Sequence, residues 1–181
     1  MKIIDAKQLS AMTTAAITAP RLRTHKNLHD SPSEPIQQVV IAFQPGTYVR
    51  PHRHGPGIWE MFALLDGALA VLIFDDDGTL TQRVELRSNG DRIVQLDAGL
   101  WHSLVVLEPN SLALEVKPGP YVQTTDKDFA IWAPAEGAED AAAFVAWMES
   151  AEIGVKRGEN CRNDQLPFGL ASLIAGSWTE R

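Results

Sequence analysis

The chain has 181 residues, of which 45% are hydrophobic and 22% charged, so it can bury a sizeable core and lacks the composition of a disordered protein. Its formal net charge of -7 argues against unaided binding to nucleic acid or to an anionic membrane, and no apolar run is long enough to span a bilayer. With only Cys161, the sequence has neither an internal disulfide framework nor a cysteine metal site. We therefore expect a globular cytoplasmic protein with no nucleic-acid or membrane partner.

Residues 1–20 are predicted to be helical at first. Asp5 can cap this helix, Gln8 stands at the third helical position as in a capping box, and Pro20 ends it. The following segment, residues 21–35, is polar and contains two prolines, which predicts an extended loop. Residues 1–35 would thus form an N-terminal extension of helix and loop.

Residues 36–125 have the pattern of a β domain. Eight short runs are rich in β-branched and aromatic residues, and turn dipeptides such as Pro45-Gly46 and Asp77-Gly78 separate them. The runs are QVVIAF, YVRPHRH, WEMFALL, ALAVLIF, QRVEL, RIVQL, HSLVVLE and LALEVK. Their spacing of about 8–12 residues predicts a sandwich or barrel. Eight such runs suit a mostly β, single-domain jelly roll, the fold class that includes cupins.

Residues 126–181 are predicted to be a C-terminal helical extension. Phe144, Trp147 and Met148 recur at helical spacing within EDAAAFVAWMESA, which predicts an amphipathic helix packed on the barrel. Further on, GVKRGENCRND is typical of a loop, and LPFGLASLIAGSW fits either a short apolar helix or an arm that docks on a partner subunit. This tail and the exposed strand edges favour a homodimer.

One stretch carries most of the chemistry. It holds His52, His54 and Glu60, and His102 follows in a later run. Three imidazoles and a carboxylate suit one divalent transition-metal ion, and we predict Fe, Mn, Ni or Zn. His52 and His54 would point to the same face of a strand. The alternatives are ordinary hydrogen-bonded histidines, or a metal with a structural role only, as in a closed zinc site.

The order of these residues fits the two cupin motifs. Gly46 and Gly67 frame the first, and Gly90, Gly99 and His102 mark the second, in which Asp97 and Val106 stand where Pro and Asn are usual. With RLRTHKNLH, LIFDDDG, GLWHSLVVLEP, LEVKPGPY and DKDFAIWAPAEG, the chain resembles the WbuC-type cupin-fold metalloproteins over about residues 20–140. The resemblance implies a metallocupin with ligands at His52, His54, Glu60 and His102, and a role in surface-polysaccharide metabolism.

Two groups of polar residues are candidates for contact with a ligand. Glu115 and Lys117 share one strand face, so Lys117 could bind a carboxylate or phosphate or act as an acid or base with a lowered pKa; a plain Glu–Lys pair at the rim is the alternative. Arg50 and Tyr48 have the same parity as His52, which predicts inward, substrate-binding side chains, although a solvated charge is the alternative for Arg50.

The barrel mouth provides a second group of candidates. Asn27 and His29 lie in the polar loop and would close over the mouth to contact a ligand, or else cap a turn. Tyr121 follows K-P-G-P and would line the same mouth, whereas His25 is expected at the surface.

The candidate ligands and polar residues lead to three alternative hypotheses of function. The first is a metal-dependent isomerase or epimerase acting on a small polar metabolite such as a sugar or sugar acid, with Lys117 or Glu115 moving the proton. The second is an Fe(II)-dependent dioxygenase that uses the same ligands. The third is a non-catalytic cupin that binds a sugar and regulates a polysaccharide pathway.

Overall fold

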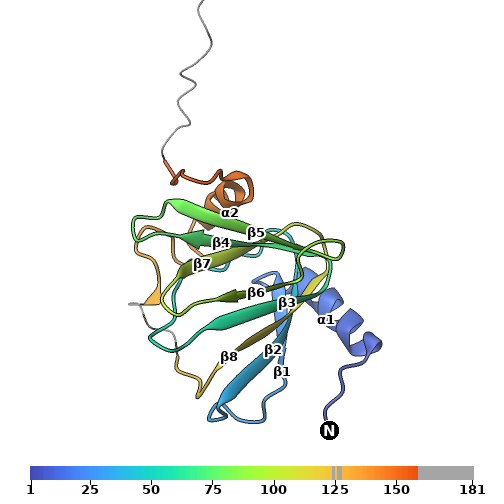
Figure 1. Cartoon of the computed structure of the whole chain (residues 1–181). Coiled ribbons are helices and arrows are strands. Elements are labelled where there is room, and N and C mark those ends of the chain that lie inside the picture. The colour runs from blue at the N-terminus through green and yellow to red at the C-terminus, as the bar shows by residue number, and fades with distance from the viewer. Residues whose placement is uncertain (124, 126–127, 159–181) are drawn as a thin grey trace, which may run out of the picture.

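The computed structural model describes residues 1–123, 125 and 128–158, and two antiparallel sheets face each other at its centre (Figure 1). The five-stranded sheet has the order β1-β2-β8-β3-β6, with bounds β1 (Arg23–Asn27), β2 (Ile36–Phe43), β3 (Glu60–Asp66), β6 (Ile93–Leu96) and β8 (Ser111–Pro118). The three-stranded sheet has the order β5-β4-β7, with bounds β4 (Ala68–Phe74), β5 (Leu80–Arg87) and β7 (Trp101–Val106). The predicted fold class, a mostly β jelly roll with a helix in each terminal extension, is confirmed.

The strand β4 explains how the sheets are held together. It is a continuous apolar run, predicted at its observed bounds, and all seven of its residues are buried. Leu69, Val71 and Ile73 belong to an apolar cluster with Phe62 of β3 and Leu104 of β7. The alternate residues of β4 belong to a second cluster with α2. The strand is therefore covered on both faces.

One helix covers each outer face. The first, α1 (Ala6–Thr18), begins at the predicted capping box of Asp5 and Gln8, and its Ala16 packs with Val40 and Ala42 of β2. The second, α2 (Ala141–Ser150), was also predicted, and it lies over the three-stranded sheet (Figure 1). Neither described helix is long and apolar enough to cross a membrane.

Two sequence predictions of local structure were wrong. The supposed loop of residues 21–35 contains β1, which pairs antiparallel with β2 and extends the sheet. The run YVRPHRH forms no strand; only His52 pairs, through isolated bridges to His102 and Phe129. Pro51 has no N–H to donate, which removes a ladder hydrogen bond just before His52.

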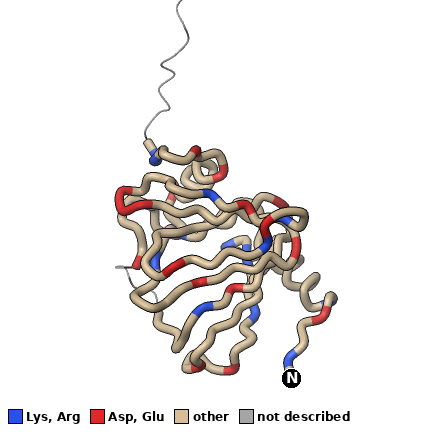
Figure 2. The backbone as a smooth tube through the Cα atoms, in the orientation of Figure 1, with Lys and Arg blue, Asp and Glu red and all other residues tan. Residues whose placement is uncertain are grey.

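The predictions for Cys161, for LPFGLASLIAGSW and for most of GVKRGENCRND lie outside the described residues. Over the described part, acidic and basic residues are interspersed along the whole tube instead of gathering in one stretch (Figure 2).

Candidate metal centre

The four predicted ligands come together inside the barrel. The backbone N–H of His52 donates to the carbonyl of His102 (3.0 Å), and that of His102 donates to the carbonyl of His52 (2.9 Å), so the two residues lie directly opposite each other. Glu60 is the first residue of β3, and His54 reaches it with Nε2 3.3 Å from Oε1. One ligand atom of each residue lies within 4.8 Å of the others. The fold thus unites the four residues that the motifs indicated.

Backbone carbonyls fix the orientation of two of the imidazoles. The Nδ1–H of His52 donates to Arg50 O (3.0 Å), and the Nδ1–H of His102 donates to Leu100 O (2.9 Å). A carbonyl oxygen can only accept, so the proton of each neutral ring lies on Nδ1 and the lone pair on Nε2 faces the cluster. Such outer hydrogen bonds are typical of metal-binding histidines.

The pair formed by Glu60 and His102 tests whether a cation fits. His102 Nε2 and Glu60 Oε2 lie 2.9 Å apart, yet both are buried atoms without an aligned hydrogen-bond partner. With the imidazole proton on Nδ1, two lone pairs would face each other at this distance. A cation among the four ligand atoms would satisfy both, so the donor set and its geometry fit a divalent metal ion.

The pKa values of the ligands follow from burial and from their mutual contacts. Burial lowers the pKa of His52 to about 3, which keeps that ring neutral and its lone pair available. Burial alone would raise the pKa of Glu60, but its polar contacts with His102 and His54 outweigh burial and lower the pKa well below its usual value. Burial alone would lower the pKa of His102, but Glu60 outweighs it and the net shift is upward. Glu60 is therefore the anionic centre of the cluster.

Lys117 and Glu115 lie beside the cluster. Lys117 Nζ is 3.2 Å from Glu60 Oε1 and 2.8 Å from Glu115 Oε1. Burial and the charge of Glu60 raise the pKa of Glu115 to about 7. Burial alone would lower the pKa of Lys117, but Glu115 and Glu60 outweigh it and raise that pKa. The lowered pKa considered for Lys117 from the sequence is therefore wrong, and this side chain is an ammonium cation near pH 7.

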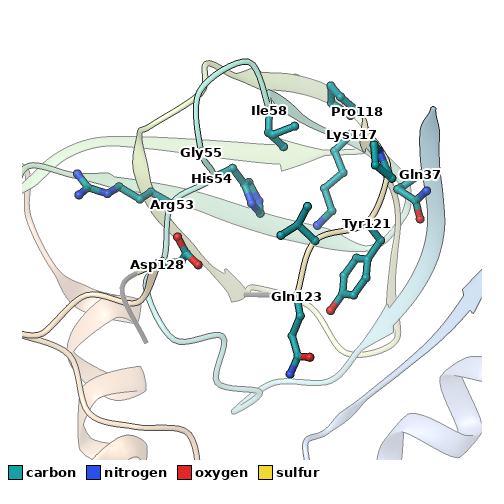
Figure 3. Close-up of a pocket in the computed structure, with 12 residues that line it drawn as sticks. Gln37, Arg53, His54, Gly55, Ile58, Lys117, Pro118, Tyr121, Gln123 and Asp128 are labelled. Atoms are coloured by element: carbon teal, nitrogen blue, oxygen red, sulfur yellow. The ribbon is translucent and has the colours of Figure 1, made fainter. Parts of the chain in front are cut away.

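Hollows of the barrel lie on two sides of the cluster. A mouth of about 200 Å³ is lined by His54 and Lys117, whose side chains project into it in Figure 3, with Tyr121 at its edge. An inner cavity of about 370 Å³ lies between the sheets and is lined by His52 and Glu60. A third hollow of about 290 Å³ adjoins β1. Lys117 lines all three, so it lies where these spaces meet.

The predicted substrate-binding residues divide into two groups. Asn27, His29 and Tyr121 line the third hollow together with Glu115 and Lys117, and Tyr121 also lines the mouth. Their contact with a ligand stays a prediction. The ring of His29 also accepts a hydrogen bond from the backbone N–H of Gln38 (3.1 Å), so it has a structural role as well.

Arg50 and Tyr48 do not point toward the cluster, and their predicted substrate contacts are wrong. Arg50 donates to the carbonyl of Ala130 (2.8 Å) and lies over the ring of Phe129. Tyr48 is buried in the outer cluster and donates to the carbonyl of Pro134 (2.8 Å). The parity argument failed because residues 47–51 form no regular strand, and Val49 is the neighbour that lines the cavity.

Several residues at these hollows were not predicted from the sequence. Gln37 is a buried amide at the mouth, and Arg53 and Asp128 lie at the opposite side of it (Figure 3). His25, expected at the surface, is exposed but lines both the inner cavity and the third hollow. Gln37 shares the parity of Val39 and Ile41 on β2, and this alternation is the signal that would have found it.

A family model described as a domain of unknown function (DUF6016) matches residues 4–86, which include His52, His54 and Glu60 but not His102. No curated protein matches. Among solved structures, TT1209 from Thermus thermophilus is 20% identical, with a TM-score of 0.49 over 65% of this chain and 97% of that one. KdgF from a Halomonas species is also 20% identical, with a TM-score of 0.45 over 58% and 85%.

A cupin superfamily protein from Desulfitobacterium hafniense is 14% identical, with a TM-score of 0.43 over 53% of this chain and 76% of that one. Similarity at this level carries no information on substrate or reaction. The sheet topology and the cluster define the class of the protein: a two-sheet jelly roll with a three-histidine, one-glutamate site of metal-binding composition. The narrower resemblance to WbuC-type proteins stays a prediction.

Proposed function

We propose that this protein is a metal-dependent enzyme that moves a proton next to a carbonyl or hydroxyl group of a small chelating metabolite. The observation that carries this proposal is the contact of Lys117 with both Glu60, a ligand candidate, and Glu115, which is not one. An ammonium group and a second carboxyl group thus lie directly beside the place where a divalent ion would be held. A sugar or sugar acid, as expected from the sequence, is one member of this class of metabolites.

His52, His54, Glu60 and His102 would hold the ion through three Nε2 atoms and a carboxylate. When bound, such an ion supplies a Lewis acid that polarises a substrate oxygen. Glu60 and His102 are buried, which keeps bulk water away from their side of the cluster and strengthens each electrostatic contact there.

Two side chains beside the cluster bind the substrate and transfer the proton. Lys117 is a cation within reach of all three hollows, so it binds and orients an anionic group of the substrate. Glu115, with its raised pKa, exchanges a proton with a substrate carbon or oxygen at neutral pH. Acid–base catalysis requires both a suitable position and a pKa near the operating pH, and Glu115 combines the two.

Hydrogen exchange into candidate substrates tests this assignment. The protein is loaded with Mn(II), Fe(II), Ni(II) or Zn(II) and incubated in D2O with 2-oxo and 2-hydroxy acids and with keto-sugars. Proton NMR then follows deuterium incorporation next to the carbonyl. We expect exchange in the native protein and at least a 100-fold slower rate in Glu115→Gln, since a general base contributes about 10²–10⁴-fold.

The control is Glu108→Gln, because Glu108 is an exposed carboxylate of the loop after β7. Unchanged exchange in Glu115→Gln would refute the role of Glu115. Uptake of O2 coupled to substrate loss, abolished when zinc replaces iron, would instead support the dioxygenase alternative. Ligand binding without any turnover would support a non-catalytic cupin.

A further inference from the structure

The inner cavity has a polar end and an apolar body. Its polar end is formed by His52, Glu60, Glu115 and Lys117, and the walls are apolar side chains of β2, β3, β7 and the segment before His52. These wall residues are Val39, Ile41, Phe43, Val49, Phe62 and Leu104. The volume of about 370 Å³ lies in the range of sites for small molecules.

The strand register shows how this apolar body extends from the metal end. Along β2 and β8, Gln37 pairs with Lys117 and Val39 pairs with Glu115, and the next inward position of β2, Ile41, pairs with an alanine. Each inward position lies two residues, roughly 6.8 Å, farther from Lys117. Beyond the row of Glu115, β2 and its inward neighbours on β8 present no charged side chain to the cavity.

The polar side chains that border the cavity from β1 and from the residues just before it are mostly engaged in other contacts. Arg23 donates to Glu136 (2.8 Å) and to the carbonyl of Tyr48 (2.8 Å). Arg21 also pairs with Glu136, and the hydroxyl of Thr24 donates to the carbonyl of Met12 (3.0 Å). His25 is thus the polar group that remains at this rim.

These surroundings discriminate between two kinds of chelating metabolite. A sugar acid would place hydroxyls against the apolar walls of β2, β3 and β7, which offer no side-chain hydrogen-bond partner, and each such desolvated hydroxyl weakens binding. A hydrocarbon chain or ring in the same place gains affinity by burying apolar surface. The walls therefore favour an apolar body over a polyhydroxylated one.

We infer that the ligand of this site is an amphipathic acid, with a carboxylate and a neighbouring keto or hydroxyl oxygen at the metal end and an aliphatic or aryl body along β2. This inference rests on the proposed function, because it states which chelating metabolite the site accepts. The sugar acid expected from the sequence is thereby replaced by an acid that has the same carboxylate and neighbouring oxygen but an aliphatic or aryl group in place of the hydroxylated carbons.

A series of 2-hydroxy acids tests the inference by calorimetry on the metal-loaded protein. From lactate to 2-hydroxyhexanoate, affinity rises about fourfold for each added methylene. Gluconate has the same six carbons and the same head as 2-hydroxyhexanoate but carries four further hydroxyls. We expect gluconate to bind at least about tenfold more weakly. A flat series, or tighter binding of gluconate, would overturn the inference.

Variants of β2 locate the effect in the cavity. Ile41→Trp fills the cavity, so we expect it to remove the gain in affinity from the longer chains. The matched control, Ile36→Trp, lies on the same strand with an exposed side chain and keeps the full series. If Ile41→Trp fails to fold, the chain-length series on the native protein decides the matter alone.

Binding without metal separates this inference from the proposed function. The carboxylates from acetate to hexanoate are titrated into metal-free protein, where only Lys117 is needed to bind the carboxylate group. We expect the same gain in affinity for each added methylene as in the 2-hydroxy acid series, at lower overall affinity. Absence of metal binding with this gain intact refutes the proposed function and leaves the amphipathic ligand standing. Stoichiometric metal binding with flat series in both titrations refutes the ligand class alone.

Discussion

The two faces of the three-stranded sheet differ in what they do. On the outer face, Phe74 and Trp101 pack with Phe144 of α2, and these three residues line none of the three hollows described above. On the inner face, Leu104 belongs to a second cluster that also forms a wall of the cavity and borders the charged groups around Glu60. Neighbouring residues of β7 illustrate the division, because Trp101 points outward to the helix and His102 inward to the metal candidates. One face mainly stabilises the fold, and the other is shaped for a ligand.

The largest effect is expected on the outer face. Phe144 is fully buried, so Phe144→Ala leaves a cavity and lowers the free energy of unfolding by about 3–5 kcal/mol. The folded fraction still binds metal with native affinity. Urea unfolding and a metal titration measure the two properties. Ile131→Ala, at a 94% exposed position, is the control, with a change within about 0.5 kcal/mol. Loss of metal affinity in folded Phe144→Ala would contradict the division.

The next largest effect is expected on the inner face. His52→Ala removes a ligand and lowers metal affinity by at least about 100-fold, since loss of an outer hydrogen-bond partner alone costs about 10–100-fold. Competition with a chromophoric chelator measures this affinity. His29→Ala is the control, because that histidine lines the third hollow and lies outside the cluster. Equal affinities for the two variants would show that the cluster is not the binding site.

A smaller effect tests the corrected position of Tyr48. Tyr48→Phe removes the hydrogen bond to Pro134 O and leaves that acceptor unpaired, which lowers the free energy of unfolding by about 1–2 kcal/mol. Ligand binding in the barrel stays unchanged. Thermal unfolding and the calorimetric series described for the cavity measure both. Weaker ligand binding with unchanged stability would restore the original prediction from the sequence.

The smallest effect is expected for the ion pairs of Glu136 with Arg21 and Arg23. Burial alone would raise the pKa of Glu136, but Arg21 and Arg23 outweigh it and lower that pKa. A lowered folded-state pKa contributes stability above the unfolded value of about 4.3, and this contribution is lost as the pH falls through the folded-state pKa.

Glu136→Gln therefore costs less than about 1 kcal/mol at pH 7, because the pair is partly exposed. The difference from the native protein shrinks as the pH falls below about 4. Urea unfolding at pH 7, 5 and 3.5 measures it. A difference that grows toward acidic pH would contradict the assigned sign.

Local sequence patterns predicted the elements that obey one simple rule. The strand β4 is a continuous apolar run, and the capping box of Asp5 places the start of α1. The strand β1 was missed because its inward residues, Arg23 and His25, are polar and line the inner cavity instead of packing in a core, so the strand lacks apolar alternation. An edge strand of this kind is recognised only from its partner.

Local sequence patterns also predicted only part of the candidate site. The four candidate ligands were predicted because a motif fixes their order, and the common face of Glu115 and Lys117 was predicted because β8 is paired with β2 along its whole length. Arg50 and Tyr48 were misplaced because alternation does not hold across Pro51, where the chain pairs only at His52. Parity predicts the direction of a side chain only within a strand that is continuously paired.

The central claim is that three histidines and Glu60 bind one divalent metal ion. A crystal structure of the metal-loaded protein with anomalous scattering at the metal edge tests it most directly. We expect a single peak about 2.0–2.3 Å from the Nε2 atoms of His52, His54 and His102 and from the carboxylate of Glu60. Absence of a peak there, or a peak ligated by Glu115 in place of Glu60, would contradict it.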